Sequence, residues 1–245
     1  MRYNYSDICL LFEKAVKIAA LNIKNINNNL DLRFKSDLSP VTRADIESNN
    51  AIIQTIKHLN VQFISEESNL NYEEVLKNKY YILIDPLDGT KEYISGGKDY
   101  TINIALMYKN EPIIGVIYAP KLDELYSAIK GKGLFLNKKL IKLNPNRIKN
   151  RVVVSKSHLH SKTKEYLKNK NFDKVIKMGS SLKLCKLACG EFSSYPRFSS
   201  SKEWDIAAGN LILSEMGGEI IDLSTGNKMI YGKPNLINGP FIASI

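Results

Sequence analysis

Two acidic side chains and one carbonyl group in the segment 85–90 (Asp-Pro-Leu-Asp-Gly-Thr) could form a metal site. The segment directly follows a short apolar run, so Asp85 and Asp88 are expected where a buried strand stops. Pro86 fixes its own φ angle and disfavours a helical conformation at the residue before it, which predicts a turn. On such a turn both carboxylates and the Leu87 carbonyl can converge on one point. This oxygen-only set suits Mg²⁺ better than Zn²⁺.

The residues after this turn are candidates for binding a phosphate group. Gly89 and Thr90 open the segment 91–94, which has the length of a short helix. The first amide groups of a helix have no hydrogen-bond partner within the helix, and such free amides bind phosphate. The sequence therefore predicts a metal site and a phosphate site side by side.

Two further acidic segments are candidates for the same site. Glu66 and Glu67 follow the apolar run 61–64, and Asp205 stands at the start of an amphipathic segment. Each has an ordinary structural interpretation, because a glutamate pair is commonly solvated and an aspartate at a helix start is commonly a cap. Together with residues 85–90 they predict carboxylates converging beside a phosphate-binding helix start. That arrangement is typical of two-metal phosphoryl hydrolysis.

The elements that must position these groups divide the chain into two patterns. In the first, helical periodicity covers residues 6–27, and a second helix begins after Thr42, with Asp45 three residues later as in a capping box. Apolar runs of strand length follow at 61–64, 80–84, 101–108, 113–118 and 124–129. The last three of these runs read as an antiparallel meander, so the first part is predicted to be α+β.

Strands and helices alternate after residue 150. Strands are predicted at 152–155, 174–178, 193–195 and 219–221, and helices at 162–169, 182–189 and 204–216. This alternation indicates an α/β unit in which helices cover a sheet. A boundary near 144–146 (Asn-Pro-Asn) gives an N-terminal part, 1–145, with most of the metal ligands. The C-terminal part, 146–245, carries Asp205 and is expected to carry residues that determine substrate specificity.

The composition is that of an ordinary globular chain. Its 245 residues, 44% hydrophobic and 24% charged, can bury a core without disulfide bonds. The cysteines, Cys9, Cys185 and Cys189, are few and odd in number, which favours a cytoplasmic location. Cys185 and Cys189 lie one helical turn apart, and small buried side chains are favoured over a metal pair. Charged residues interrupt the apolar segment 8–26, which is interpreted as an amphipathic helix and not a membrane span.

The net charge of +10, from 35 Lys and Arg against 25 Asp and Glu, favours an anionic partner. A nucleic acid, a membrane surface and a phosphorylated small molecule all fit. The lysines are scattered and not interleaved with aromatic residues on one face, so no stable nucleic-acid partner is expected, and a non-enzymatic nucleic-acid-binding protein is a remote alternative. Peripheral association with the cytoplasmic face of the inner membrane stays open, as does the choice between monomer and homodimer.

The order and spacing of these motifs resemble the inositol monophosphatase superfamily of Mg²⁺-dependent, lithium-sensitive phosphatases. The shared segments are 65–68 (Ser-Glu-Glu-Ser), 85–90 and 204–209 (Trp-Asp-Ile-Ala-Ala-Gly). Further segments resemble its bacterial bisphosphate nucleotidase branch, namely 39–45 (Ser-Pro-Val-Thr-Arg-Ala-Asp), 88–93 (Asp-Gly-Thr-Lys-Glu-Tyr), 179–183 (Gly-Ser-Ser-Leu-Lys) and 195–198 (Tyr-Pro-Arg-Phe). Inositol phosphatases more typically carry Thr-Asn in place of Lys91 and Glu92, and lack the last segment.

The resemblance implies a layered αβαβα sandwich of the sugar-phosphatase type, with the active site between the two parts. It also implies two or three Mg²⁺ ions per site, with ligands that map onto Glu66, Asp85, the Leu87 carbonyl, Asp88 and Asp205. The catalytic residues that would activate and hold the attacking water map onto Thr90, Glu66 and Asp45. The segment 35–42 would be a mobile loop that closes over the phosphate.

The implied reaction is hydrolysis of the 3′-phosphate of adenosine 3′,5′-bisphosphate to AMP and phosphate, with 3′-phosphoadenosine 5′-phosphosulfate as a further substrate. The expected substrate-binding residues are Gly89, Thr90, Gly179, Ser180, Ser181, Lys183, Tyr195, Arg197 and Asp205. Among these, Lys183 and Arg197 would bind the second phosphate. Tyr195 or Phe198 would stack on adenine, with core packing as the alternative for both rings.

Two alternatives accompany this assignment. One is a phosphatase of the same superfamily that acts on inositol monophosphate or fructose 1,6-bisphosphate. The other concerns a single side chain, because Arg197 could pair with Glu203 and merely hold the loop before Trp204.

Overall fold

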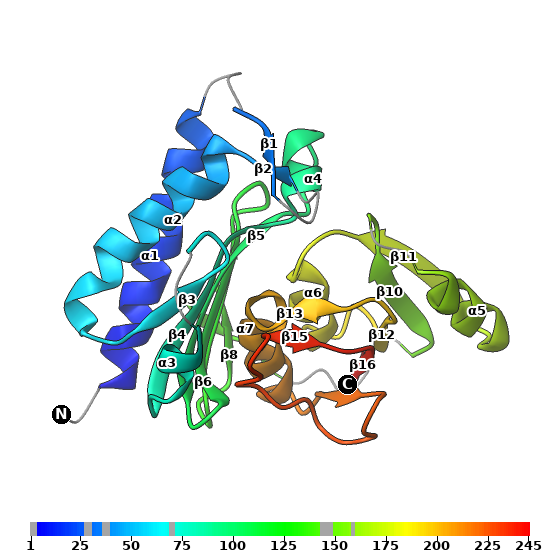
Figure 1. Cartoon of the computed structure of the whole chain (residues 1–245). Helices are drawn as coiled ribbons and strands as arrows, with labels where there is room; N and C mark the ends of the chain where they lie inside the picture. The colour runs from blue at the N-terminus through cyan, green and yellow to red at the C-terminus, as the bar shows by residue number, and fades with distance from the viewer. Residues whose placement is uncertain (1–3, 27–30, 36–39, 69–71, 143–148, 158–159) are drawn as a thin grey trace.

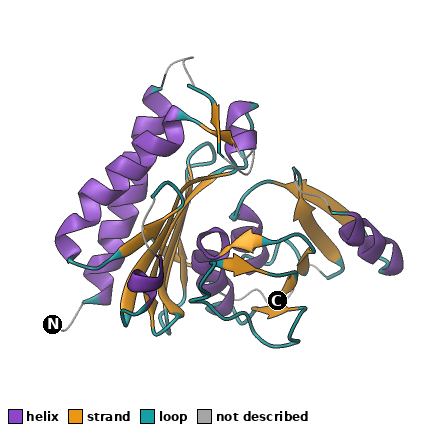
Figure 2. Cartoon of the chain, in the orientation of Figure 1, coloured by secondary structure: helices purple, strands orange, loops and turns teal. Residues whose placement is uncertain are grey.

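The computed structural model describes residues 4–26, 31–35, 40–68, 72–142, 149–157 and 160–245. Its strands form two large sheets separated by helices, and further helices lie on the outer side of each sheet (Figure 2). This stacking of helices, sheet, helices, sheet and helix is the predicted αβαβα sandwich. The predicted loop 35–42 is described only in part, because residues 36–39 lie outside these ranges.

The larger sheet has seven strands in the order β3-β4-β5-β6-β7-β8-β9. They are β3 (Phe63–Ser65), β4 (Tyr80–Asp88), β5 (Thr101–Tyr108), β6 (Glu111–Ala119), β7 (Glu124–Ile129), β8 (Leu134–Leu136) and β9 (Lys139–Leu140). Only the pair β3 and β4 is parallel. The antiparallel meander predicted for the central strands is confirmed.

Strand β4 extends further than the sequence indicated. The prediction ended it at Ile84, but the strand runs on to Asp88. Asp85 pairs with Asn103 and Asp88 pairs with Thr101, with a shift of register between the two pairs. The bulge therefore accommodates the proline inside the strand, because β5 continues alongside and holds both ends of the segment.

Helices α1 (Tyr5–Asn25) and α2 (Arg43–Ile56) cover one face of the large sheet (Figure 1). The apolar positions Ile8, Phe12 and Ala19 of α1 follow the helical repeat, and they pack in one core with the sheet. The predicted capping box at the start of α2 is present. Within the described ranges, no helix is long and apolar enough to cross a membrane.

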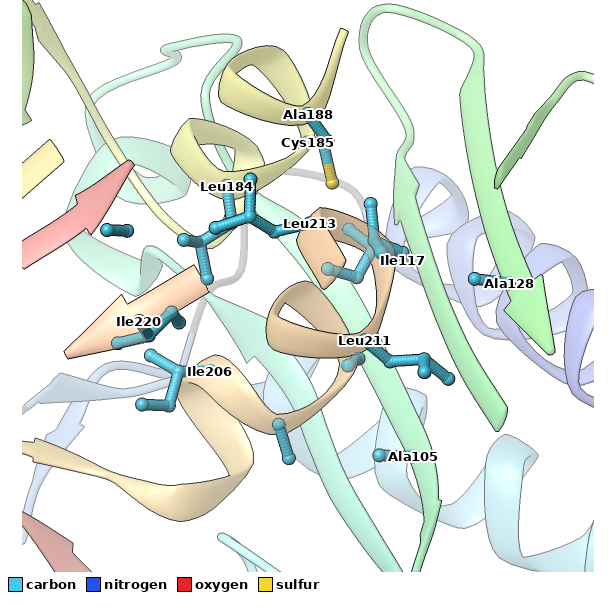
Figure 3. Packing of buried hydrophobic residues seen from close by; sticks show 14 of the residues in the cluster. Ala105, Ile117, Ala128, Leu184, Cys185, Ala188, Ile206, Leu211, Leu213 and Ile220 are labelled. Atoms are coloured by element: carbon cyan, nitrogen blue, oxygen red, sulfur yellow. The ribbon is translucent and has the colours of Figure 1, made fainter. Parts of the chain in front are cut away.

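Helices α6 (Leu182–Ala188) and α7 (Glu203–Ser214) fill the space between the two sheets. Leu184 and Leu211 of these helices belong to one buried core with Ile117 of β6 (Figure 3). Gly115 on β6 lets α7 approach closely, since a Cβ atom there would lie 2.7 Å from the carbonyl oxygen of Ala208. Cys185 is buried in this core, as predicted for a small apolar side chain, whereas Cys189, for which the same was predicted, is only half-buried against it.

The smaller sheet has five strands in the order β11-β10-β12-β16-β14. They are β10 (Arg151–Ser155), β11 (Lys174–Met178), β12 (Ser194–Arg197), β14 (Glu219–Asp222) and β16 (Phe241–Ser244). Strand β10 is parallel to both of its neighbours, and β16 is antiparallel to both of its own. Helix α5 (Ser161–Asn169) lies on the outer side of this sheet (Figure 1).

Short elements complete the described structure. They are β1 (Arg33–Phe34), β2 (Pro40–Val41), the 3₁₀ helix η1 (Lys57–Leu59), α3 (Tyr72–Leu76), α4 (Thr90–Ile94), β13 (Ser201–Lys202) and β15 (Ile237–Asn238). The segment 144–146, proposed as a domain boundary, lies outside the described residues. One core contains side chains from both proposed parts, such as Ile117 and Leu213. The division at residue 145 stays a prediction.

Candidate active site

A cleft of about 390 Å³ lies where the acidic end of β4 faces α6, α7 and the smaller sheet. Eleven of the predicted site residues line this cleft, and they are Glu66, Asp85, Leu87, Asp88, Gly89, Thr90, Gly179, Ser180, Lys183, Arg197 and Asp205. Three others, Asp45, Ser181 and Tyr195, lie behind its wall. Segments that are far apart in the sequence therefore meet at one place.

The bulged end of β4 fixes the first carboxylate of the cleft. Asp85 is 1% exposed and its Oδ1 accepts a hydrogen bond from the Leu87 amide at 3.1 Å. The hydroxyl group of Ser48, on α2, donates to the Pro86 carbonyl oxygen at 2.6 Å. The backbone between the two aspartates is thus fixed by one hydrogen bond within the bulge and by one from the neighbouring helix α2.

Thr90 and Asp45 form a hydrogen-bonded pair beside this turn. The Thr90 hydroxyl lies 3.1 Å from Asp45 Oδ1 and 3.2 Å from the Leu87 carbonyl oxygen. The other oxygen of Asp45 accepts from the amide and the hydroxyl of Thr42, both at 2.7 Å. A hydroxyl has one proton and two lone pairs, so when it donates to Asp45 it still presents an acceptor to a water molecule.

Glu66 reaches the cleft from the end of β3. Its amide donates to the Ile84 carbonyl oxygen at 3.2 Å, which extends the pairing of β3 with β4. Its carboxylate is 2.8 Å from Lys35 Nζ, and the same amine contacts Glu67 at 2.7 Å. Lys35, the first residue of the expected mobile loop, therefore neutralises part of the acidic wall.

Asp205 occupies the third position of α7. The Lys202 amide donates to its Oδ2 at 3.0 Å, which is the capping interaction expected of an aspartate at a helix start. The same side chain lines the cleft. Capping and a role in the cleft are therefore compatible, because the cap occupies one carboxylate oxygen.

Burial and mutual repulsion act together on these carboxylates. Burial, reinforced by the charge of Glu66, raises the pKa of Asp85 well above its ordinary value. Burial and the charge of Asp88 raise the pKa of Asp205 to about 7. A group of buried anions of this kind favours either protons or a cation, and its oxygen donors are those that Mg²⁺ prefers.

In this structure each acidic group instead has a partner within the protein. Glu66 pairs with Lys35, Asp88 accepts from the Ser181 amide at 2.5 Å, and Asp205 accepts from the Lys202 amide. Across the described ranges, no three His, Cys, Asp or Glu side chains stand close enough together to hold a metal ion. The fit to Mg²⁺ therefore rests on the chemistry of the oxygen donors and on their place along one cleft.

The opposite wall of the cleft carries positive charge. Lys183 is only 3% exposed, and its Nζ donates to the carbonyl oxygens of Met178 and Ser180 at 3.3 and 2.5 Å. Arg197 ends β12, and its Nη2 donates to the Ser200 carbonyl oxygen at 2.9 Å. The Arg197 Nε is buried, with no hydrogen-bond partner among the described residues.

The alternative pairing of Arg197 with Glu203 is not found among the described residues. The buried Glu203 carboxylate accepts from the amides of Gly232 and Lys233, at 2.9 and 3.0 Å, and pairs with the Lys233 amine. Glu203 is thus saturated by the 232–233 segment, and Arg197, which lines the cleft, is not paired with it.

The turn between β11 and α6 differs in part from the prediction. Gly179 and Ser180 line the cleft as expected, and a Cβ atom at Gly179 would lie 2.6 Å from the Asp99 carbonyl oxygen. Ser181 is buried instead, because its amide is bound to Asp88 and its hydroxyl donates to Asn103 Oδ1 at 2.8 Å. Ser181 thus orients an acidic residue and does not face the cleft.

The two aromatic side chains proposed to stack on adenine lie elsewhere. Tyr195 is 2% exposed, packs edge-on against Phe241 with ring centroids 5.4 Å apart, and lies beneath Lys183. Phe198 packs against Tyr166 of α5 at 5.6 Å. The core-packing alternative is therefore correct for Tyr195, since β16 covers the ring that the sequence pattern left free.

Several residues on the cleft wall were not singled out as site residues from the sequence. They are Lys35, Pro40, Tyr72, Lys91, Glu92, Ser155, Lys156, Met178, Lys202 and Trp204. Most come from segments whose local pattern indicates only a strand end or a loop. Lys91 and Glu92 did carry a signal, because they distinguish this chain from the inositol phosphatase pattern.

Comparisons with known proteins agree with this architecture. The sequence profile of the inositol monophosphatase family matches residues 6–243. The 3′(2′),5′-bisphosphate nucleotidase CysQ of Escherichia coli strain K12 is 37% identical over 98% of this chain and 98% of its own.

Two solved structures have the same fold. The crystal structure of CysQ from Bacteroides thetaiotaomicron has a TM-score of 0.84 and 29% identity, with 98% of each chain covered. An IMPase/NADP phosphatase complexed with Mg²⁺ and phosphate has a TM-score of 0.79 and 22% identity, over 98% of this chain and 89% of its own. The chain therefore belongs to the inositol monophosphatase family.

Proposed function

We propose that this phosphatase hydrolyses the 3′-phosphate of adenosine 3′,5′-bisphosphate, giving AMP and inorganic phosphate. 3′-Phosphoadenosine 5′-phosphosulfate is proposed as a second substrate. The observation that carries the proposal is one cleft with a carboxylate wall for phosphoryl chemistry and a wall with Lys183 and Arg197 for a second anionic group. The similarity to the bisphosphate nucleotidase of Escherichia coli over nearly the full length supports the same activity.

Magnesium is the proposed cofactor. Glu66, Asp85, the Leu87 carbonyl, Asp88 and Asp205 would hold it, since they are hard oxygen donors on one cleft. When bound, Mg²⁺ supplies Lewis-acid stabilisation of charge on the phosphate oxygens and makes a nearby water molecule more acidic. A relative of the same fold was solved with Mg²⁺ and phosphate, which supports this choice.

Thr90 and Asp45 are proposed to orient the attacking water. Asp45 is fixed by two hydrogen bonds from Thr42. Its other oxygen therefore accepts the hydrogen bond of the Thr90 hydroxyl in a defined direction. The Thr90 oxygen then accepts a hydrogen bond from the water, which points a water lone pair at phosphorus. The water forms the new phosphorus–oxygen bond and gives up a proton through Thr90 to Asp45, while the bond to the ribose oxygen breaks and that oxygen takes up a proton from the solvent.

Gly89, at the start of α4, is proposed to stabilise the transferred phosphoryl group. Its φ angle of +92° lies in the left-handed region, and the following residue begins the helix. Amides at such a turn can donate to the equatorial oxygens, on which charge develops in the transition state. The leaving ribose oxygen faces away from the water in this in-line geometry.

Lys183 and Arg197 are proposed to bind the phosphate that is not cleaved. Among the described residues the buried Nε of Arg197 has no hydrogen-bond partner, which is costly and favours an anionic ligand beside this guanidinium. A bisphosphate carries this second group, whereas an inositol monophosphate does not. The cationic wall is therefore the proposed source of selectivity.

A comparison of substrates tests this proposal. Purified protein with Mg²⁺ is supplied with adenosine 3′,5′-bisphosphate, inositol 1-phosphate or fructose 1,6-bisphosphate at equal concentration, and phosphate release is measured. The nucleotide should be hydrolysed at least tenfold faster than either alternative. A preference for inositol 1-phosphate or fructose 1,6-bisphosphate would assign the chain to another activity of the family. No release from any of the three would overturn the assignment as a phosphatase.

A further inference from the structure

Glu92 is a buried carboxylate on the cleft wall that the proposed reaction does not use. It lies on α4, two residues after Thr90, and is 4% exposed. It also lines the cleft. A charged side chain in this position needs a polar partner, because burying an unpaired carboxylate is strongly unfavourable.

The protein provides Glu92 with one hydrogen-bond donor. The Ser157 hydroxyl, just beyond the end of β10, donates to Glu92 Oε1 at 2.5 Å. No donor contacts the second oxygen, Oε2, within the part of the chain that the structure describes. One oxygen is therefore anchored to the smaller sheet, while the other keeps an unused acceptor.

Two glycines leave room for this carboxylate. A Cβ atom at Gly179 would lie 2.7 Å from Glu92 Cγ, which no real side chain tolerates. A Cβ atom at Gly89 would lie 3.4 Å from Glu92 Oε2, so this oxygen is directed toward the turn that carries Thr90. Glu92 is thus held between the catalytic turn and the wall formed by residues 179–180.

A carboxylate beside an anionic substrate repels the phosphates, so its contribution to binding must come from a hydrogen-bond donor of the substrate. A nucleoside 3′,5′-bisphosphate offers two kinds of donor, the ribose hydroxyl next to the cleaved phosphate and the amino group of the base. Glu92 is within one helical turn of Thr90, which acts at the cleaved phosphate. The donor that the substrate places nearest to that phosphate is the vicinal 2′-hydroxyl.

We propose that Glu92 determines specificity by accepting a hydrogen bond from the ribose hydroxyl adjacent to the phosphate that is cleaved. This inference rests on the proposed nucleotidase function and adds a contact to the sugar. It makes the enzyme selective for a phosphate with a neighbouring free hydroxyl group. The Ser157 hydroxyl fixes the orientation of the carboxylate, and Oε2 makes the contact.

The test compares adenosine 3′,5′-bisphosphate with its 2′-deoxy counterpart in the wild type, Glu92→Gln and Glu92→Asp. In the wild type, loss of the hydroxyl should lower kcat/KM about ten- to a hundredfold, as for a hydrogen bond to a charged group. Glu92→Gln should lower kcat/KM for the ribonucleotide about five- to tenfold and leave that for the deoxynucleotide nearly unchanged. Glu92→Asp keeps the charge but shortens its reach, so it should show the same selective loss.

The decisive quantity is the ratio of the two kcat/KM values, because the missing hydroxyl also changes the leaving group equally in every variant. Glu111 of β6 is an exposed glutamate paired with Lys130, so Glu111→Gln is the matched control and should keep the wild-type ratio. An unchanged ratio in both Glu92 variants would overturn the inference and leave Glu92 as part of the cleft wall only. Failure of the wild type to hydrolyse either nucleotide would instead contradict the proposed function itself.

Discussion

The two walls of the cleft are built in different ways. On the acidic side of the cleft, backbone amides and buried hydroxyl groups fix the carboxylates, both in the wall, as for Asp85, and behind it, as for Asp45. Cations of the opposite wall, Lys183 and Arg197, donate to carbonyl oxygens a few residues away. The acidic wall is thus part of the framework, whereas the cationic wall consists of side chains that extend from it.

This difference indicates a division of labour. Phosphoryl transfer needs groups placed to within a fraction of an ångström, which a bulged, buried strand end provides. Substrate selection needs a positive charge near the second anionic group, and it tolerates more variation in the position of the charged side chain. Changes to the acidic wall should therefore affect every substrate, and changes to the cationic wall should affect bisphosphates selectively.

The largest effect is expected from Asp88→Asn. The amide keeps the shape and still accepts a hydrogen bond from Ser181, but it removes a negative charge from the proposed metal site. Turnover of both adenosine 3′,5′-bisphosphate and inositol 1-phosphate should fall by orders of magnitude, with little change in the melting temperature. Asp205→Asn should behave alike. Near-wild-type turnover in either variant would show that the substituted residue only forms a turn or caps a helix.

Removing the Thr90 hydroxyl should have the next largest effect. Thr90→Ala deletes the group that links Asp45 to the attacking water, so kcat should fall about a hundred- to a thousandfold for all substrates. Thr90→Ser keeps the hydroxyl and is the matched control. If Thr90→Ala and Thr90→Ser turn over equally fast, the hydroxyl has no role in catalysis.

Arg197→Ala tests the cationic wall. A charge-assisted hydrogen bond to phosphate contributes roughly 1.5–3 kcal/mol, so kcat/KM for the bisphosphate should fall about ten- to a hundredfold, mainly through KM. The value for inositol 1-phosphate should change little. Arg43→Ala, which removes an exposed arginine paired with Glu47, should leave both values unchanged. If Arg197→Ala lowered kcat/KM equally for both substrates, this side chain would not distinguish the bisphosphate from the monophosphate.

The smallest effect concerns stability and pH. Burial and Asp88 raise the Asp205 pKa from 3.8 to about 7 in the metal-free fold, so the folded state binds more protons than the unfolded state between these values. The free energy of unfolding should then decrease as the pH rises from about 4 to about 7. Mg²⁺ should raise the melting temperature more at pH 7.5 than at pH 5.5, because it competes with these protons.

Asp205→Asn provides the control for this pH dependence. The variant lacks the titrating group, so its melting temperature in EDTA should vary less with pH over the same interval. A wild-type melting temperature that falls no more steeply than that of the variant between pH 5 and 7 would contradict the assigned pKa shift.

Local chemistry made most of the acidic wall predictable. The residues Asp85, Leu87, Asp88 and Thr90 lie within one short segment, so their types and spacing suffice to identify a donor set. The extent of β4 was not predictable in the same way. Its last residues are strand only because β5, more than a dozen positions later, pairs with them across the bulge.

Long-range packing explains what the sequence did not reveal about the other wall. Tyr195 resembles a ligand-stacking residue in its local segment, yet Phe241 covers its ring from the last strand of the chain. Ser181 is directed to Asp88, which lies 93 residues earlier. The first contact depends on the pairing of β12 with β16, and the second depends on how the two sheets dock. No periodicity in either segment encodes them.

The dependence of turnover on Mg²⁺ tests the central claim most directly. Purified protein is treated with EDTA, desalted, and assayed with adenosine 3′,5′-bisphosphate before and after Mg²⁺ is added. The oxygen donors of the acidic wall predict no measurable phosphate release in the chelated protein and full recovery when Mg²⁺ is restored. Undiminished release in the presence of EDTA would contradict a metal-dependent centre built on Asp85, Asp88 and Asp205.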